Sequence, residues 1–251
     1  MSTHDDPEAP APRGGGSRPG APAFAPGGAA DAGAAAHSSG ASPGFVPGTA
    51  TPTVVPPPLT PPERVRLDEA FRATLARGVH GMCFSPYLEG QQPGSQIREA
   101  QIRERMAIVA PHTRWVRSFS CTDGHEQTPR IAHEMGLKTL VGAWLGTDAE
   151  INERELEGAI AVARAGHADI VAVGNEVLLR EDLGEDELID CIERVRRALP
   201  GVPVGYVDAY FLFEKHPRVT AACDVVMTNC YPFWEGCPRE QALAYMQTML
   251  A

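Results

Sequence analysis

The sequence lacks any long hydrophobic run, since about 18 consecutive apolar residues, the length of a membrane-spanning helix, occur nowhere in it. The first residues, MSTHDDPEAP, are acidic and lack the apolar core of a secretory signal peptide. We therefore expect no membrane segment and no signal peptide in this chain. Its localisation stays open, with the cell envelope or a membrane, reached through regions downstream of the chain, as one alternative.

Motifs that hold metal ions are also missing. The six cysteines form no CxxC pair, and no cysteine–histidine quartet has the spacing of a zinc site. The eight histidines occur in neither HExxH nor HxH. We therefore expect no metal site. Because most of the cysteines fall inside apolar runs, we expect them to be buried free thiols.

Signals for nucleotides and nucleic acids are absent as well. The formal net charge is −10, and no basic stripe with interleaved aromatic residues occurs. The loop expected after the first strand, FSPYLEGQQPG, contains neither GxGxxG nor GxxxxGK(S/T), the glycine-rich patterns that cradle phosphates. The sequence therefore predicts no nucleic-acid partner and no cofactor.

The first quarter of the chain has a strongly biased composition. Of residues 1–62, 47 are Ala, Gly, Pro, Ser or Thr, and none is Lys. Such a segment has too little apolar surface to offset the entropy lost on ordering. We expect residues 1–62 to be a disordered low-complexity linker and residues 63–251 to form the folded domain.

From residue 78 onward, apolar strand-like runs alternate with segments of helical periodicity. Strands are predicted at 78–87, 113–120, 138–146, 169–176, 202–210 and 224–231. Helices are predicted between and after them, at 97–111, 125–136, 147–166, 185–199 and 238–251, with Thr147 and Glu150 in a capping box. Each unit has about 30 residues, the size of a βα unit. Strands alternating with helices imply a parallel sheet, either doubly wound or part of a (β/α)8 barrel.

The residues at the strand ends favour the barrel. In a barrel, catalytic side chains project from the C-terminal ends of several strands. The predicted ends carry polar and aromatic residues, namely Ser85, Tyr87, Arg117, Asp123, Trp144, Asp148, Asn175, Glu176, Asp208, Tyr210, Asn229, Tyr231 and Trp234. Aromatic faces beside amides and carboxylates suit a sugar, whose ring has an apolar face and a rim of hydroxyl groups. No lysine stands at a strand end, which argues against Schiff-base chemistry.

Four segments resemble a known family. VAVGNEVLLR is similar to the motif around the general acid/base of glycoside hydrolase family 17, the β-1,3-glucanases. GMCFSPY, RWVRSFSCTDG and MTNCYPFWEG resemble segments of the same family, in the right order. The resemblance leans toward the fungal and bacterial branch and covers roughly 78–250. It implies retaining hydrolysis or transglycosylation of β-1,3-glucan on a (β/α)8 barrel, with a β-glucan oligo- or polysaccharide as the partner.

The resemblance also implies roles for individual residues. Glu176 matches the general acid/base position, and Asn175 matches the residue that hydrogen-bonds the sugar 2-hydroxyl. Asn229 and Tyr231 match positions on the sixth strand that line the site, and Tyr87 matches one on the first strand.

Three further residues are weaker candidates for substrate contacts. Trp144 and Trp234 are sugar-stacking platforms by a looser match, with a place in the core as the alternative. Arg117 lies inside an otherwise strand-like run, so we expect it to be buried near the site in an ion pair. For Glu176 itself, a structural ion pair with Arg180, one helical turn later, is the alternative to catalysis.

The chain departs from the family pattern at the nucleophile. The family carries a nucleophilic Glu at the end of the seventh strand, and no matching motif occurs here. Acidic residues at other strand ends match no nucleophile position: Asp123, Asp148, Asp208 and Glu235. We therefore expect an incomplete barrel of about six βα units, truncated at its C-terminal end, that is inactive on laminarin and poorly soluble by itself. The alternatives are a β-1,3-glucan transglucosylase of a glucan-synthesis system and a non-catalytic glucan-binding barrel fragment.

Overall fold

The computed structural model describes residues 60–238 and 241–250. All but the last three residues of the predicted disordered segment 1–62 lie outside these ranges, so that expectation stays a prediction. The same holds for the predicted domain boundary at residue 63, although helix α1 (Pro61–Arg77) already spans it.

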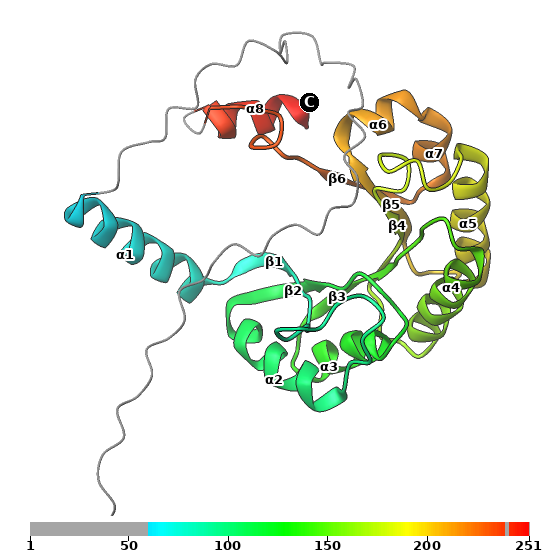
Figure 1. Cartoon of the computed structure of the whole chain (residues 1–251), viewed down its shortest axis with the longest axis horizontal. Helices are drawn as coiled ribbons and strands as arrows, with labels where there is room; N and C mark the ends of the chain where they lie inside the picture. The colour runs from blue at the N-terminus through cyan, green and yellow to red at the C-terminus, as the bar shows by residue number, and fades with distance from the viewer. Residues whose placement is uncertain (1–59, 239–240, 251) are drawn as a thin grey trace, which may run out of the picture. The chain divides into compact units, whose positions relative to one another are not determined.

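Six strands form one parallel sheet, with each strand beside its neighbour in the sequence. The strands are β1 (Val79–Cys83), β2 (Thr113–Arg117), β3 (Lys138–Ala143), β4 (Ile170–Asn175), β5 (Val204–Ala209) and β6 (Val225–Asn229). A doubly wound sheet reverses its strand order at one point. Here the order runs from β1 to β6 without a reversal, and the sheet curls as it does so (Figure 1). This confirms the predicted incomplete (β/α)8 barrel.

Helices follow the strands, and all but the last of them cover the outside of the curled sheet (Figure 1). They are α2 (Glu99–Val109), α3 (Thr128–Glu134), α4 (Ala149–Arg164), α5 (Glu185–Ala198), α6 (Tyr210–Lys215), α7 (Pro217–Ala222) and α8 (Ala242–Met249). Short 3-10 turns occur at Ala110–His112 and His125–Gln127. Helices α2 to α5 were predicted. No helix was predicted in the region of α6 and α7, and the predicted helix 238–251 contains the undescribed residues 239, 240 and 251.

Helix α1 was not predicted, although its start carries a recognisable signal. Thr60 and Glu63 form a capping box in which the Glu63 carboxylate accepts from the Thr60 backbone N–H at 2.8 Å. None of its residues is buried, and Val65, Leu67 and Phe71 are more than half exposed. Neither α1 nor any other helix of the described residues is long and apolar enough to cross a membrane.

The core lies between the sheet and the surrounding helices. The predicted apolar stripe of α5, Leu188, Ile192 and Val195, is fully buried against β4 and β5. Side chains from β3, β4 and β5 complete this cluster, and a second, smaller one lies around α2, α3 and β2. The fold therefore fixes the strand ends rigidly, because close-packed elements leave the loops little freedom at their bases.

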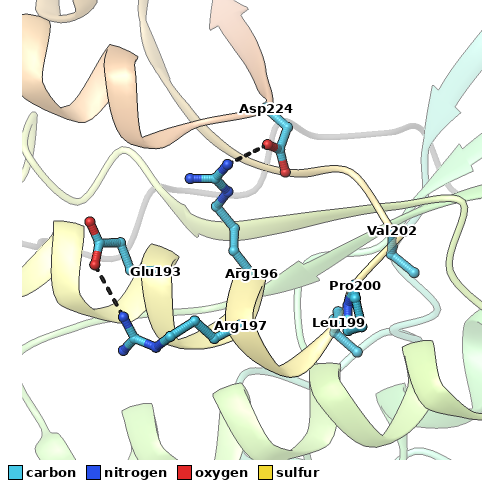
Figure 2. A pocket seen from close by; sticks show the side chains of 8 residues that line it. Glu193, Arg196, Arg197, Leu199, Pro200, Val202 and Asp224 are labelled. Atoms are coloured by element: carbon cyan, nitrogen blue, oxygen red, sulfur yellow. Dashed lines mark hydrogen bonds and ion pairs between the residues drawn. The ribbon is translucent and has the colours of Figure 1, made fainter.

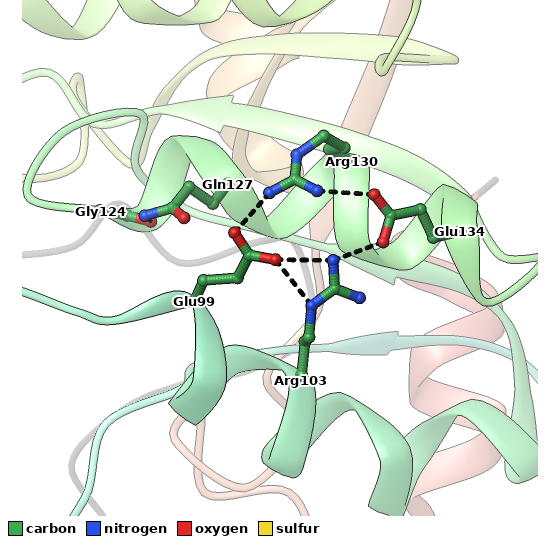
Figure 3. Close-up of polar contacts among 6 residues, drawn as sticks. All are labelled: Glu99, Arg103, Gly124, Gln127, Arg130 and Glu134. Atoms are coloured by element: carbon green, nitrogen blue, oxygen red, sulfur yellow. Dashed lines mark hydrogen bonds and ion pairs between the residues drawn. The ribbon is translucent and has the colours of Figure 1, made fainter.

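Helices α2 and α3 are joined by a network of four charged side chains (Figure 3). Arg103 of α2 pairs with Glu134 of α3 at 2.6 Å, and Arg130 of α3 pairs with Glu99 of α2 at 2.9 Å. Each arginine also pairs within its own helix. The four side chains are partly exposed, so solvent screens them and the network adds orientation more than stability.

Two expectations about local structure were wrong. The N-cap of α4 is Asp148, whose carboxylate accepts from the N–H groups of Glu150 and Ile151, and not Thr147 of the predicted capping box. Asp148 caps the helix in place of Thr147 because its carboxylate reaches the free N–H groups of the first turn and also complements the helix dipole. Of the six cysteines, which are all free, only Cys121 is buried, because the others lie at strand ends, in loops or on a helix flank.

Candidate active site

The C-terminal edge of the sheet brings several predicted residues together. Arg117 ends β2, Asn175 ends β4, and Asn229 ends β6. Glu176 and Tyr231 follow β4 and β6 in the loops at this edge. Parallel strands place these ends side by side, so residues far apart in the sequence meet here.

Glu176 is held by two residues from the end of β6. Its Oε1 accepts a hydrogen bond from Asn229 Nδ2 at 2.7 Å and another from the Tyr231 hydroxyl at 3.0 Å. Burial, together with the hydrogen bond to Glu176, raises the pKa of Tyr231 to about 12, so this hydroxyl stays a donor at neutral pH. One carboxylate oxygen is therefore fixed and the other is left for a ligand.

Asn175 is oriented by Arg117. A guanidinium N–H of Arg117 donates to Asn175 Oδ1, and the guanidinium lies 4.6 Å from the centre of the Phe119 ring. Burial lowers the pKa of Arg117. The expected ion pair was wrong, because the partner is a neutral amide and not a carboxylate. With Oδ1 occupied, Asn175 presents its Nδ2 donor to a ligand.

Arg180 does not pair with Glu176. Its guanidinium donates to Asp182 at 2.7 Å and to the Leu145 carbonyl at 2.9 Å, and it lies 4.7 Å from the centre of the Trp144 ring. Arg180 thus joins the loop after β4 to the loop after β3. An ion pair with Arg180 was the alternative role for Glu176, and it is wrong because this guanidinium is engaged with Asp182 and Leu145.

A bulge in β4 changes the direction of the residues that follow it. Between Ala172 and Asn175 the register with β5 shifts, because β4 contains one residue more than β5 does over this stretch. Gly174, inside the bulge, has φ +88°. Glu176 has φ 54°, a left-handed conformation that costs a non-glycine residue about 1–2 kcal/mol. Non-glycine residues in this conformation cluster at functional sites.

Replacing Gly174 by alanine should damage this turn. A Cβ at Gly174 would lie 2.7 Å from Val177 Cγ2 and 3.3 Å from the Tyr206 ring, in a backbone conformation that alanine avoids. We expect Gly174→Ala to lower the free energy of unfolding by about 2 kcal/mol or more, which urea unfolding measures. Gly146→Ala is the matched control, since a Cβ there meets nothing within 4 Å. Equal stability of the two variants would contradict the prediction.

Two cavities open at this edge of the sheet. One, of about 450 Å³, is lined by Arg117, Asn175, Asn229 and Tyr231 beside Glu176. The other, of about 720 Å³, is lined by residues of the loops after β1, β2 and β3, among them Tyr87, Phe119, His125 and Trp144. Phe119 lines both cavities, so they are neighbours.

The structure places the remaining candidates around the larger cavity or outside both. The Tyr87 hydroxyl lies 3.1 Å from His125 Nε2, and the two rings meet edge to face. Trp144 is 39 % exposed and forms a wall of the larger cavity. Trp234 lines neither cavity; it is 79 % exposed beside Phe233 in the loop after β6.

A buried glutamate that the sequence reading missed supports the larger cavity. Glu155 of α4 is 2 % exposed, and its carboxylate accepts four hydrogen bonds. The donors are the hydroxyls of Ser120 (2.5 Å) and Thr122 (2.6 Å) and the backbone N–H groups of Cys121 (2.7 Å) and Trp144 (3.1 Å). Glu155 lies between Asn152 and Leu156 on the buried face of α4, and a carboxylate on an apolar face was the available signal.

The other acidic residues at strand ends are engaged elsewhere. Asp148 caps α4, and Glu235 accepts from the Tyr245 hydroxyl at 2.7 Å. Asp208 is fully buried, and burial raises its pKa. Asp123 alone lines a cavity, the larger one. Among residues 60–238 and 241–250, no three His, Cys, Asp or Glu side chains are grouped to hold a metal ion.

A third cavity, of about 450 Å³, lies at the opposite edge of the sheet (Figure 2). It is lined by residues just before β5 and β6, such as Val202 and Asp224, and by the last turn of α5. Arg196 pairs with Asp224 at 2.8 Å, and Arg197 pairs with Glu193 at 3.1 Å. Because barrel active sites form at the C-terminal ends of strands, this cavity is on the wrong side to belong to the site around Glu176.

Comparison with known proteins assigns the family. A family model described as the BtgE/BtgC glycoside hydrolase domain matches residues 81–251. The chain belongs to this family. The match begins inside β1 and runs to the end of the chain, so strands β2 to β6 and the second half of β1 fall within it. It confirms the resemblance to the β-1,3-glucanase family.

Curated relatives of this glycoside hydrolase domain have related names. A glucan 1,3-beta-glucosidase of Schizosaccharomyces pombe is 28 % identical over 142 residues, which are 51 % of this chain and 44 % of the relative. Glucan 1,3-beta-glucosidase BGL2 of Candida albicans is 26 % identical over 146 residues, 51 % of this chain and 47 % of the relative. The matched part thus spans about half the length of these relatives.

Solved structures share the fold of the glycoside hydrolase domain. An active-site mutant of Rhizomucor miehei beta-1,3-glucanosyltransferase in complex with laminaritriose superposes with a TM-score of 0.59 at 21 % identity. The match covers 70 % of this chain and 65 % of that one. The structure of a glycoside hydrolase family 17 beta-1,3-glucanosyltransferase from the same organism superposes with a TM-score of 0.59 at 20 % identity, and the match covers 69 % of this chain and 65 % of that one.

Proposed function

We propose that this domain is part of a retaining glycoside hydrolase that acts on β-1,3-glucan, with Glu176 as the general acid/base. The observation that carries the proposal is the Glu176 carboxylate at the end of β4, fixed by Asn229 and Tyr231 beside a cavity. A proton donor must lie within reach of the glycosidic oxygen and keep one orientation through the reaction. The names of the curated relatives support β-1,3-glucan as the substrate.

Retention needs two carboxyl groups about 5–5.5 Å apart, one donating the proton and the other attacking the anomeric carbon. Asp208 is a poor nucleophile, because it is fully buried and both of its oxygens accept hydrogen bonds. We propose that the nucleophile is a glutamate on a seventh strand, outside the six strands of the described residues. Glu176 would first protonate the leaving oxygen and then deprotonate the water, or the sugar hydroxyl, that releases the product.

The neighbouring side chains suit a bound glucan chain. Asn175 offers its Nδ2 to a sugar hydroxyl, with Arg117 acting through Asn175 and not on the sugar. Further sugar units would occupy the larger cavity, where Tyr87 and Trp144 provide aromatic faces for stacking. Trp234, exposed in the loop after β6, would serve only units beyond these cavities.

This function is tested by incubation with laminarihexaose. The protein used must include the proposed seventh strand, and we call it the full-length protein. We expect cleavage with the β-anomer as the first product in the proton NMR spectrum, and no cleavage of cellohexaose, which has β-1,4 links. Products longer than the substrate would identify transfer to a second sugar, and shorter products alone would identify hydrolysis. Release of the α-anomer would contradict retention, and binding without products would support a non-catalytic glucan-binding barrel.

A further inference from the structure

Two buried polar residues of β5 lie directly beneath the turn that carries Glu176. Tyr206 and Asp208 are two positions apart, so their side chains leave the same face of the strand. Both are fully buried. The turn itself, from Glu176 to Asp182, is closed by backbone hydrogen bonds from Arg180 N–H to the Glu176 carbonyl and from Asp182 N–H to the Val177 carbonyl.

The two side chains contact this turn on both sides of Glu176. The Tyr206 hydroxyl donates to Asp208 Oδ2 and accepts from the Leu178 N–H at 2.9 Å. Asp208 Oδ2 also accepts from the Leu179 N–H at 3.4 Å. On the other side of Glu176, the Tyr206 ring lies 3.3 Å from where a Cβ on Gly174 would be.

A strained residue persists only where its surroundings over-determine its conformation. The left-handed backbone of Glu176 has such surroundings, because its own N–H donates to the Val207 carbonyl at 2.8 Å. The N–H groups two and three residues later, of Leu178 and Leu179, are held by Tyr206 and Asp208. All of these contacts come from β5, which is rigid within the core.

We propose that Tyr206 and Asp208 are positioning residues for Glu176, which fix its backbone conformation and thereby aim its carboxyl group at the glycosidic oxygen. This proposal rests on the general-acid role proposed above. Neither residue touches the substrate, since both are buried on the helical side of the sheet, and they act only through the turn.

Asp208→Asn is the informative substitution. The carboxylate accepts from Tyr206, Leu179 and, at 2.7 Å, the Ala209 N–H, using both oxygens. With its oxygen toward the Ala209 N–H, an asparagine turns its NH2 group toward the donors of Tyr206 and Leu179; with the opposite orientation, its NH2 group lies against the Ala209 N–H, which repels it. Either orientation shifts the side chain against the turn, so the turn should loosen while the shape of the side chain stays the same.

Two aryl laminaribiosides separate positioning from general loss of structure. Phenolate is a poor leaving group that needs a proton from the general acid, whereas 2,4-dinitrophenolate leaves without one. In the full-length protein, we expect Asp208→Asn to lower kcat/KM at least tenfold for the phenyl substrate and less than twofold for the dinitrophenyl substrate. Tyr206→Phe should act in the same direction. Asp190→Asn, the same change on the exposed side of α5, should alter neither.

Parallel losses on both substrates would overturn the proposal, because they indicate a structural role, and unchanged kcat/KM values would overturn it too. Amide hydrogen exchange provides a readout that does not depend on activity. We expect exchange in residues 177–180 to become at least tenfold faster in Asp208→Asn, and unchanged exchange would also refute positioning. If the wild type cleaves neither substrate while exchange responds as expected, the proposed function fails and the support of the turn by β5 stands.

Discussion

Glu176→Gln should lower kcat on laminarin by about 10²–10⁴-fold in the full-length protein, the usual contribution of a general acid/base. The substitution removes the proton but keeps the shape. Gln retains one oxygen that can accept the hydrogen bonds from Asn229 Nδ2 and the Tyr231 hydroxyl. We therefore expect KM to change little and the folded structure to persist. Release of reducing sugar over a range of laminarin concentrations measures both constants.

The matched control for this substitution is Glu104→Gln. Glu104 is exposed on α2, on the outside of the sheet and away from Glu176, and should keep wild-type activity. Circular dichroism of both variants checks that each is folded. Substantial turnover by a folded Glu176→Gln protein would show that another residue donates the proton, and the assignment of Glu176 would then be wrong.

The strand order and the helices on the outside of the sheet could be predicted because they follow from local patterns. Buried parallel strands appear as short apolar runs, and α5 repeats its apolar residues at helical spacing. The short helices α6 and α7 escaped prediction because six residues are too few to establish a period. Helix α1 was missed, although a capping box marks its start and Leu67, Phe71 and Leu75 recur at four-residue spacing.

The part of the site that could be predicted consists of side chains at the C-terminal ends of the strands, because these ends lie at one edge of the sheet. Asn229 and Tyr231 meet Glu176 across more than 50 residues of sequence, as expected for parallel strand ends. The bulge at Gly174 could not be foreseen, since it depends on the register between β4 and β5. The partner of Arg117 could not be foreseen either. A strand-like pattern indicates that the side chain is buried, but it does not say whether an amide or a carboxylate faces it.

Two buried carboxylates have comparable functions on neighbouring loops. Asp208 holds the turn after β4, and Glu155 holds the loops after β2 and β3. A buried carboxylate is tolerated only when hydrogen bonds replace its hydration. Both residues meet this condition with donors that include backbone N–H groups of the loops. The loops are therefore held by the residues beneath them.

A larger destabilisation than that of Gly174→Ala should follow Glu155→Leu, which we expect to lower the free energy of unfolding by about 3–5 kcal/mol. The carboxylate accepts from two hydroxyls at Oε1 and from two backbone N–H groups at Oε2. Leucine accepts no hydrogen bond, so all four donors lose their partner. The Ser120 and Thr122 hydroxyls line the larger cavity and can rotate toward solvent, but the backbone N–H groups of Cys121 and Trp144 cannot rotate and stay unpaired.

Urea unfolding with an unchanged slope isolates this effect, because a constant slope means that the same surface is exposed on unfolding. Glu157→Leu, the same change at an exposed position on the same helix, should stay within about 0.5 kcal/mol of the wild type. Since Glu155 holds the Trp144 N–H, we also expect the tryptophan fluorescence of the folded Glu155→Leu protein to change. A loss below 1 kcal/mol with unchanged fluorescence would mean that the loops after β2 and β3 are held by their own packing, and that the four hydrogen bonds to Glu155 are incidental to the larger cavity.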